Sequence, residues 1–275
     1  EMFRDRNRVS NGQALGQMAW AGEFVGKWLT HTAQLYRLTQ HPELRETVTK
    51  VMATLAQYQA ADGYLGPFPD AKGADGLRTM KVGWDPWGHY HICLGCLLWH
   101  DCTSDPVPLN IATKIGKLMT TTFPGSNPQK FFNQGSLEQN MAILHAMALL
   151  YSKTNATDPT LLTFCKMVVA ELQMPPAGDY IRNALKGQPF YKGSQPRWEA
   201  LCGIIGFAEL YHATGETDFS TAYQQIWWSL CEYERHNQGG MMSGEQARGD
   251  PYNKQSEETC CTVTWGAMCV EMLKL

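Results

Sequence analysis

The sequence predicts an all-α protein of the α/α-toroid class, the six-hairpin type of barrel in which inner helices surround a funnel. Three observations predict it. A turn between two helices recurs four times, the helix before each turn is apolar on nearly every face, and strand-like alternation is scarce. A helix that is apolar all round is buried, whereas an amphipathic helix covers it from outside. One inner and one outer helix per repeat is therefore the expected unit.

The repeat is marked by its turns, each of which carries a threonine after an apolar helix. These residues are Thr39, Thr103, Thr154 and Thr214, so the intervals are 64, 51 and 60 residues. TPR and HEAT repeats are shorter, at about 34 to 47 residues, so a toroid is favoured. A fifth copy begins near Cys269. We therefore expect one domain over 1–275 that is incomplete at its C-terminus and is a fragment of a longer chain.

Inner and outer helices can be assigned along the chain. Segments 141–151 and 200–211 are apolar throughout and are expected to be inner helices, as is 259–275. Segments 43–59 and 221–233 are amphipathic and are expected to be outer helices.

Long loops rich in glycine and aromatic residues join each outer helix to the next inner one. They cover 62–91, 120–136, 180–199 and 236–258. In a toroid these loops gather at one end of the funnel, and long loops on a rigid scaffold carry function. The aromatic residues of these loops would offer flat apolar faces that suit sugar rings, and about half of those in any one loop would only contribute to packing. The candidates are Trp84, Trp87, Tyr90, Phe132, Tyr191 and Trp198.

Charge and hydropathy exclude two classes of partner. The net charge of −3 gives no electrostatic reason to bind nucleic acid or an anionic membrane. No apolar run reaches about 18 residues, so no bilayer-spanning segment is predicted. The first residues are polar, lack a signal-peptide core and do not start with methionine. A cytoplasmic and an exported location both stay open, and the oligomeric state is not readable.

The nine cysteines do not predict a disulfide framework, because most lie in apolar helical patterns. Cys93, Cys96, Cys165 and Cys269 are expected to be buried and reduced. The CxxC of Cys93 and Cys96 has no second CxxC, which argues against zinc or redox chemistry there. Asn155 opens a glycosylation sequon that matters only in a secreted chain.

The stretch 239–261, "GGMMSGEQARGDPYNKQSEETCC", concentrates carboxylates and thiols. Glu258 and Cys260 flank the start of the last helix. Residues two apart face different ways on a helix, so both can bind one metal only from the non-helical approach to the first turn. A thiolate there is stabilised by the helix dipole. Two ligands do not close a zinc site, and a capping glutamate beside a packed cysteine is the alternative.

This stretch resembles the terminal motif of glycoside hydrolase family 127, the β-L-arabinofuranosidase-like proteins, in which a "GG…GE" turn precedes "E-[ST]-C" at the start of an inner helix. Glu245 lies 13 residues before Glu258, within the family spacing. Two further stretches are similar to the family: the "DGYLG" loop within 59–68 and the histidine-bearing helix within 89–105.

The resemblance implies roles at the matching positions. Glu245 matches the acid/base, Glu258 and Cys260 match two zinc ligands, and His91 matches a histidine that contacts the sugar. In the family a later adjacent cysteine pair supplies the other two ligands, one of which is the nucleophile. No residue here matches that pair, since Cys261 belongs to the first motif, so the remaining ligands and the nucleophile stay unassigned. The chain is then either a fragment whose continuation completes the site or a divergent homologue, and the helix that breaks off at Leu275 favours the fragment.

The implied reaction is retaining hydrolysis that removes a non-reducing terminal sugar, with β-L-arabinofuranose as the candidate, from a glycoside or oligosaccharide. A zinc-held thiolate would attack the anomeric carbon while a glutamic acid protonates the leaving oxygen. Two alternatives remain: a metal-independent α/α-toroid enzyme, such as an unsaturated uronyl hydrolase or a sugar epimerase, and a non-catalytic carbohydrate-binding module. Sugar, anomer and linkage are not readable.

Several carboxylates have competing interpretations. Asp250 is the second carboxylate if the mechanism uses two of them, and Glu257 replaces Glu258 if the register shifts by one. Glu199 and Glu138 each begin an inner helix and either bind a sugar hydroxyl or cap that helix.

The remaining candidates are histidines and the residues near them. Because His89 and His91 alternate around Tyr90, one of them is expected to face the funnel, and His91 is the choice, with Trp84 and Trp87 as further substrate-binding residues. His145 is expected to be a core histidine. Where the family places later substrate histidines, this chain offers Asn140 and the region of Pro196 and Arg197.

Overall fold

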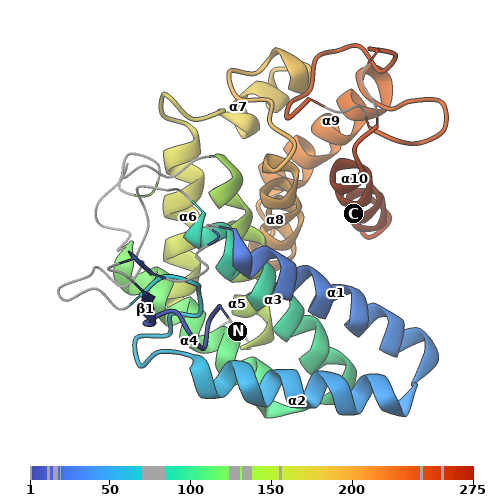
Figure 1. Cartoon of the computed structure of the whole chain (residues 1–275). Helices are drawn as coiled ribbons and strands as arrows, with labels where there is room; N and C mark the ends of the chain where they lie inside the picture. Colours follow the sequence, from blue (N-terminus) through green and yellow to red (C-terminus); the bar gives the residue numbers. More distant parts are fainter. Residues whose placement is uncertain are drawn as a thin grey trace. The chain divides into compact units, whose positions relative to one another are not determined.

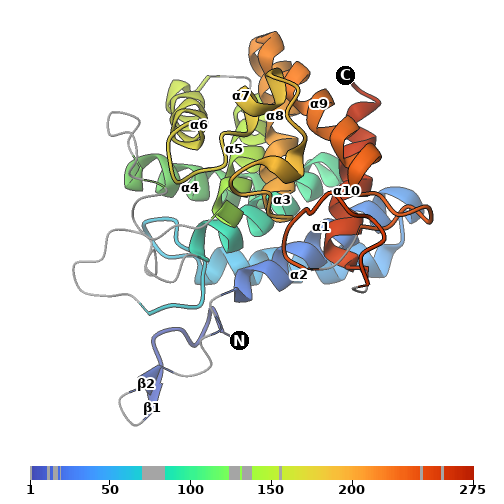
Figure 2. The ribbon, with the colours of Figure 1, turned by 90° about the horizontal axis from the view of Figure 1, so that it is seen from above.

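The computed structural model describes residues 2–10, 13–14, 18, 20–69, 84–123, 131, 138–154, 157–241, 244–254 and 257–275. The elements in chain order are β1 (Val9–Ser10), β2 (Gln13–Ala14), α1 (Ala21–Thr39), α2 (Pro42–Tyr58), α3 (Asp85–Thr103), α4 (Pro106–Thr122), η1 (Glu138–Ala142), α5 (Ile143–Lys153), α6 (Pro159–Leu172), α7 (Tyr180–Leu185), η2 (Phe190–Lys192), α8 (Ala200–Thr214), α9 (Thr217–Tyr233) and α10 (Thr259–Met272). The expected all-α class is confirmed (Figure 1). Within the described segments, strands are limited to the short antiparallel hairpin of β1 and β2 (Figure 2).

The repeated threonine ends each helix with the same hydrogen bond. The hydroxyls of Thr39, Thr103, Thr154 and Thr214 each donate to the carbonyl four residues earlier, at 2.8 to 3.0 Å. At three of these turns the same oxygen accepts the backbone N–H two residues later, at 3.2 to 3.3 Å. Proline is the first residue of α2, α4 and α6, where its missing N–H costs nothing. The recurring turn predicted from the sequence is therefore one recurring structure.

The chain divides into two compact units. They comprise 1–127, 133–136 and 158–164 in the first, and 128–132, 137–157 and 165–275 in the second. Helices α1 to α4 belong to the first unit and α7 to α10 to the second, while α6 begins in the first and ends in the second.

In the first unit α1 lies directly against α3, and glycines set the spacing. A Cβ added at Gly26 would lie 2.1 Å from the backbone carbon of His91, and one at Gly22 would lie 2.7 Å from the Cα of Gly88. Such distances leave no room for any side chain, so the two backbones meet. Helix α3 also contacts α4, which lies beside α2.

In the second unit α8 is the central helix and contacts η1, α5, α9 and α10. Ten of its residues are buried, from Ala200 to Leu210, which confirms the expected inner helix. Glycines again allow close approach: a Cβ at Gly206 would lie 2.8 Å from the backbone nitrogen of His145. Helix α5 is likewise buried along most of its length.

Helix α10 differs from the expectation of a fully buried inner helix. Cys261, Trp265 and Met268 are buried, whereas Val263 is 66% and Val270 is 55% exposed. The contacts of α10 run to α8 and α9, which cover one stripe of the helix. The apolar sequence of α10 could not reveal that, within the part of the chain that the structure describes, its other faces stay exposed.

The loop over 180–199 is less irregular than its composition suggested, because it contains α7 and η2. The "DGYLG" stretch is a loop, as expected, and the predictions for Phe132 and Asn155 fall outside the described residues.

All nine cysteines are free thiols. Cys93, Cys96 and Cys165 are buried as expected, while Cys269 is half-buried. Among the helices described, none combines the length and apolar character that a membrane-spanning segment needs.

Candidate active site

A short backbone pairing brings the glycine-rich loop against the start of α8. Arg197 and Gln246 form an isolated antiparallel bridge. The N–H of Ala247 donates to the carbonyl of Pro196 at 2.8 Å, and the N–H of Trp198 donates to the carbonyl of Glu245 at 3.4 Å. These bonds place Glu245 beside Arg197, although 48 positions separate them in the sequence.

Glu245 has an uncommon backbone conformation. Its φ is 67°, in the left-handed region, and Gly244 before it has a φ of 120°. Residues with a Cβ adopt such a φ at an energetic cost, and these residues gather at functional sites. Glu245, the acid/base expected from the sequence, therefore has a backbone conformation that contacts with neighbouring residues must stabilise.

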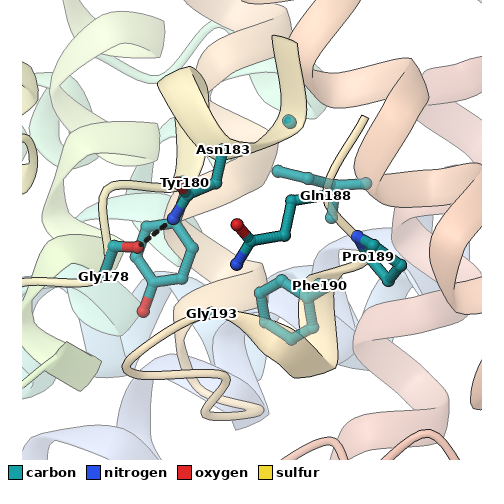
Figure 3. Close-up of a pocket in the computed structure, with 9 residues that line it drawn as sticks. Gly178, Tyr180, Asn183, Gln188, Pro189, Phe190 and Gly193 are labelled. Carbon is teal, nitrogen blue, oxygen red and sulfur yellow. Dashed lines mark hydrogen bonds between the residues drawn. The ribbon is translucent and has the colours of Figure 1, made fainter. Parts of the chain in front are cut away.

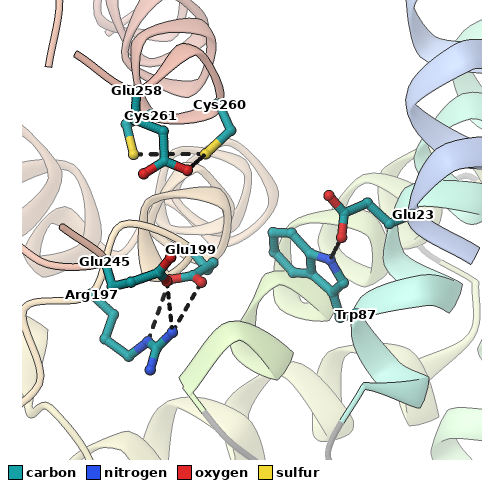
Figure 4. Close-up of polar contacts among 8 residues, drawn as sticks. All are labelled: Glu23, Trp87, Arg197, Glu199, Glu245, Glu258, Cys260 and Cys261. Atoms are coloured by element: carbon teal, nitrogen blue, oxygen red, sulfur yellow. Dashed lines mark hydrogen bonds and ion pairs between the residues drawn. The ribbon is translucent and has the colours of Figure 1, made fainter. Parts of the chain in front are cut away.

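Arg197 pairs with two carboxylates at once (Figure 4). Its Nε and Nη2 donate to both oxygens of Glu199, at 3.3 and 3.0 Å, and its Nη2 also donates to Glu245 Oε2 at 3.3 Å. The Glu199 side chain is 16% exposed and that of Glu245 is 70% exposed. The arrangement leaves the Glu245 carboxyl reachable and its neighbours fixed.

The surroundings raise the pKa of the Glu245 carboxyl. Partial burial raises it most, the nearby carboxylates of Glu199 and Glu258 raise it further, and Arg197 opposes them. A carboxyl that keeps its proton above the usual range suits a general acid.

Glu258, Cys260 and Cys261 form a second cluster at the start of α10 (Figure 4). The Cys260 thiol donates to Glu258 Oε1 at 2.7 Å, and the two sulfurs are 3.8 Å apart. The candidate ligand atoms all lie within 4.8 Å of one another. Glu258 precedes the helix with an extended φ and ψ of −105° and 125°, so Glu258 and Cys260 meet from the non-helical approach that the sequence required.

The donor set fits a soft divalent cation. Two thiolates bound to tetrahedral zinc at about 2.3 Å lie about 3.8 Å apart, which is the separation of the two sulfurs here. Contact with Cys260 and burial raise the pKa of the Cys261 thiol, so binding a cation there would release protons. Cys261 was not predicted as a ligand. The adjacent cysteine pair was the signal that could have identified it.

The Glu234 carboxylate holds the loop that carries Glu245. It is fully buried and accepts the N–H groups of Arg248 and Gly249 at 3.2 and 2.5 Å. Burial raises its pKa and the two N–H donors oppose that effect. Nothing in the local sequence marks Glu234 as an anchor, since its partners lie 14 and 15 positions later.

The competing carboxylates have other partners. Asp250 accepts the N–H of Tyr252 at 3.1 Å within a turn, and Glu257 lies 3.2 Å from Nδ1 of His236. The Glu199 side chain makes no capping bond to α8, because both its oxygens face Arg197. The capping interpretation of Glu199 was therefore wrong, and sugar binding by Glu199 stays a prediction.

Glu138 is buried rather than presented to solvent, at 8% exposure. Its Oε2 lies 3.0 Å from the hydroxyl of Tyr180, which also lies 2.6 Å from the carbonyl of Gln195. Burial raises the pKa of Glu138 to about 7.

His145 is buried as expected, and burial lowers its pKa to about 4. Asn140 is also fully buried.

The first unit contains the predicted substrate-binding residues Trp84, Trp87 and His91, and it brings them together. The ring centroids of Trp87 and His91 are 4.4 Å apart, and those of Trp84 and Trp87 are 6.4 Å apart. Trp87 is 4% exposed, and its Nε1 donates to Glu23 Oε2 at 2.7 Å (Figure 4). Substrate binding by these three residues stays a prediction.

His89 has a structural role instead. Its Nε2 accepts the N–H of Leu65 at 2.9 Å, so its Nδ1 carries the proton and donates to the carbonyl of Asp85 at 2.7 Å. The Asp85 carboxylate accepts the Tyr64 hydroxyl at 3.0 Å. The "DGYLG" loop is thus bound to the start of α3 through His89, and His91 stays the predicted substrate-binding histidine.

A cavity beside α7 is too small for a sugar (Figure 3). Its volume of about 10 Å³ is that of a single water site. Its lining includes Tyr180, Gln188 and Phe190. It is therefore a packing gap and not a substrate site.

Comparisons with known proteins agree with the sequence motifs. The family model described as "Beta-L-arabinofuranosidase, GH127 catalytic domain" matches residues 3–275. No curated protein matches the chain significantly.

Solved structures share the fold. Ara127N-Se, a GH127 β-L-arabinofuranosidase from Geobacillus stearothermophilus T6, is 22% identical with a TM-score of 0.72, over 98% of this chain and 46% of that one. The GH127 β-arabinofuranosidase BT3674 is 16% identical with a TM-score of 0.70, over 98% and 45%. The GH76 α-mannanase BT2949 of Bacteroides thetaiotaomicron is 14% identical with a TM-score of 0.57, over 99% and 77%. The predicted toroid class is confirmed, and the chain spans less than half the length of the two GH127 structures.

Proposed function

Because the chain belongs to the GH127 β-L-arabinofuranosidase catalytic-domain family, we propose that the protein is a retaining glycoside hydrolase that removes a non-reducing terminal sugar. The candidate sugar is β-L-arabinofuranose, because one GH127 structure of the same fold is named a β-L-arabinofuranosidase and another a β-arabinofuranosidase. One observation carries the proposal: backbone bonds to 196–198 and the ion pair with Arg197 hold Glu245, the residue that matches the family's acid/base.

Glu245 is the proposed general acid and base. Its carboxyl starts protonated and gives the proton to the glycosidic oxygen, while a cysteine thiolate would bond to the anomeric carbon as the glycosidic bond breaks. It then takes a proton from the water that displaces the thiolate from that carbon. The raised pKa of Glu245 and its exposed position support this role.

Glu258, Cys260 and Cys261 are the residues that would hold a zinc ion. When bound, zinc keeps a cysteine deprotonated at neutral pH and therefore nucleophilic. Three protein ligands with one open position are typical of catalytic zinc. The sulfur separation of 3.8 Å supports this donor set.

Elemental analysis of the complete protein tests the metal. We expect one zinc per chain in the wild type and in Cys269→Ser, a control on the same helix outside the cluster, and loss of zinc in Cys260→Ser. Absence of zinc from the wild type would contradict the metal site and favour a metal-independent toroid enzyme.

Turnover of aryl glycosides tests the reaction. We expect release of the aryl group from a β-L-arabinofuranoside, loss of activity with a chelator, and about 100-fold or greater loss in Glu245→Gln on substrates with poor leaving groups. NMR should show that the released sugar first appears with the same anomeric configuration as the substrate. Saturable sugar binding without turnover by the wild type would indicate a carbohydrate-binding module instead.

A further inference from the structure

The Glu245 side chain needs an external constraint. A non-glycine residue at a φ of 67° lies in a sparsely populated region, and packing does little to fix a side chain that is 70% exposed. A general acid must nevertheless keep its proton within hydrogen-bond distance of one substrate oxygen. The constraint must come from the groups that touch this loop.

The segment 196–198 supplies that constraint through its backbone. The Arg197–Gln246 bridge and the bond from Ala247 N–H to the Pro196 carbonyl fix the loop on both sides of Glu245. These bonds set the position of the Cα of Glu245. They do not set the direction of its carboxyl.

Arg197 supplies the direction. Its guanidinium is planar with its donors in a rigid fork, and Glu199 occupies two of them through both of its oxygens. The Arg197 and Glu199 side chains are 31% and 16% exposed, so the pair is more enclosed than its target. One further N–H of the same Nη2 points to Glu245 Oε2 at 3.3 Å.

We infer that Arg197, locked by Glu199, is the positioning residue of the acid/base Glu245, aiming its carboxyl and stabilising the carboxylate left when the proton has moved to the leaving oxygen. This inference rests on the proposed function. The bond from Arg197 strengthens as Glu245 becomes negative, because a charged acceptor makes the stronger hydrogen bond. Arg197 therefore acts on the step in which the leaving group departs.

Leaving-group dependence tests this role in the complete protein. An activated nitrophenyl leaving group needs no proton, whereas an alkyl or sugar leaving group does. We expect Arg197→Ala to lower kcat by about 10- to 100-fold on the alkyl glycoside and less than about 3-fold on the nitrophenyl glycoside. Arg197→Lys should restore part of the loss, and Glu199→Gln should show the same pattern more weakly.

Arg182→Ala is the matched control, since it also removes an arginine paired with a carboxylate in the same unit, that of Asp179. It should leave both rates unchanged. The double variant Arg197→Ala/Glu245→Gln should lose no more on the alkyl glycoside than Glu245→Gln alone, because coupled residues are not additive.

Two outcomes overturn the inference. If Glu245→Gln discriminates between the leaving groups and Arg197→Ala lowers both rates equally, Arg197 has a structural role alone while the proposed function stands. If Glu245→Gln does not discriminate either, the acid role of Glu245 fails and this inference fails with it.

Discussion

At the scale of single residues, burial sets the protonation of Glu138. Burial raises the pKa of its carboxyl to about 7, while the hydrogen bonds from the Tyr180 hydroxyl and the Gly178 backbone favour the ionised form and oppose that rise. The Tyr180 hydroxyl donates to Glu138 Oε2 at 3.0 Å and also lies 2.6 Å from the Gln195 carbonyl.

Glu138 therefore makes folding stability depend on pH. Below pH 4.5 both the folded and unfolded chains hold this proton, and Glu138 contributes no slope. Between pH 4.5 and about 7 the unfolded chain releases the proton and the folded chain keeps it, so the free energy of unfolding falls as pH rises. Above about pH 7 the loss levels off, at on the order of 3 kcal/mol.

The variant Glu138→Gln removes this slope, while its amide oxygen can still accept the hydrogen bond from Tyr180. Denaturant unfolding at pH 4.5 and pH 8 should show the variant gaining stability relative to wild type as pH rises. Glu43→Gln, an exposed substitution on α2, is the control and should follow the wild type. Equal slopes for Glu138→Gln and wild type would show that Glu138 is ionised in the folded chain.

At the scale of elements, glycines decide how closely inner helices pack. Gly26 on α1 has no space for a Cβ, whereas a Cβ at Gly266 on α10 would meet nothing within 4 Å. The same substitution should therefore have opposite effects at these two sites.

Gly26→Ala should destabilise the protein by about 1–3 kcal/mol, because α1 and α3 must move apart. Gly266→Ala should stabilise it by about 0.5–1 kcal/mol, because alanine is the better helix former. Thermal or denaturant unfolding of both variants measures the difference. A neutral Gly26→Ala would mean that the two helices are not in backbone contact.

The loop after α9 depends on Glu234 in a similar way. Glu234→Ala leaves the N–H groups of Arg248 and Gly249 without their carboxylate, at a cost of about 1–3 kcal/mol. We expect faster hydrogen exchange over 244–250 and a lower kcat. Glu216→Ala, which removes an exposed glutamate paired with Lys166, is the control. Unchanged exchange in Glu234→Ala would refute the anchor.

At the scale of the whole molecule, the candidate acid/base and the cysteine cluster both belong to the second unit. The first unit contains Trp84, Trp87 and His91, while Tyr191 and Trp198 belong to the second. Helix α6 begins in one unit and ends in the other.

Metal binding should couple to stability of the whole chain. A cation present at 100 times its Kd adds about 2.7 kcal/mol to the folded state, which at this chain length raises Tm by about 5–10 °C. Differential scanning fluorimetry with zinc should show this rise in the wild type and in Cys269→Ser, and none in Cys260→Ser. A wild-type Tm that ignores zinc would contradict the cluster as a folded-state metal site.

The sequence by itself determined the features that are local along the chain. The four threonine turns, the buried inner helices α5 and α8, and the pairing of Glu258 with Cys260 follow from residues within a few positions of one another. Local spacing fixes such features because hydrogen bonds of a turn and the faces of a helix repeat with the backbone.

Only the tertiary structure decided the partners that are distant along the chain. Arg197 meets Glu245 across 48 positions and Glu138 meets Tyr180 across 42, and the exposed faces of α10 depend on which helices cover it. These pairings follow from how packed helices place their ends in space. A one-dimensional pattern contains the polarity of each side chain but not its neighbour, so it identified Glu245 and could not identify the arginine beside it.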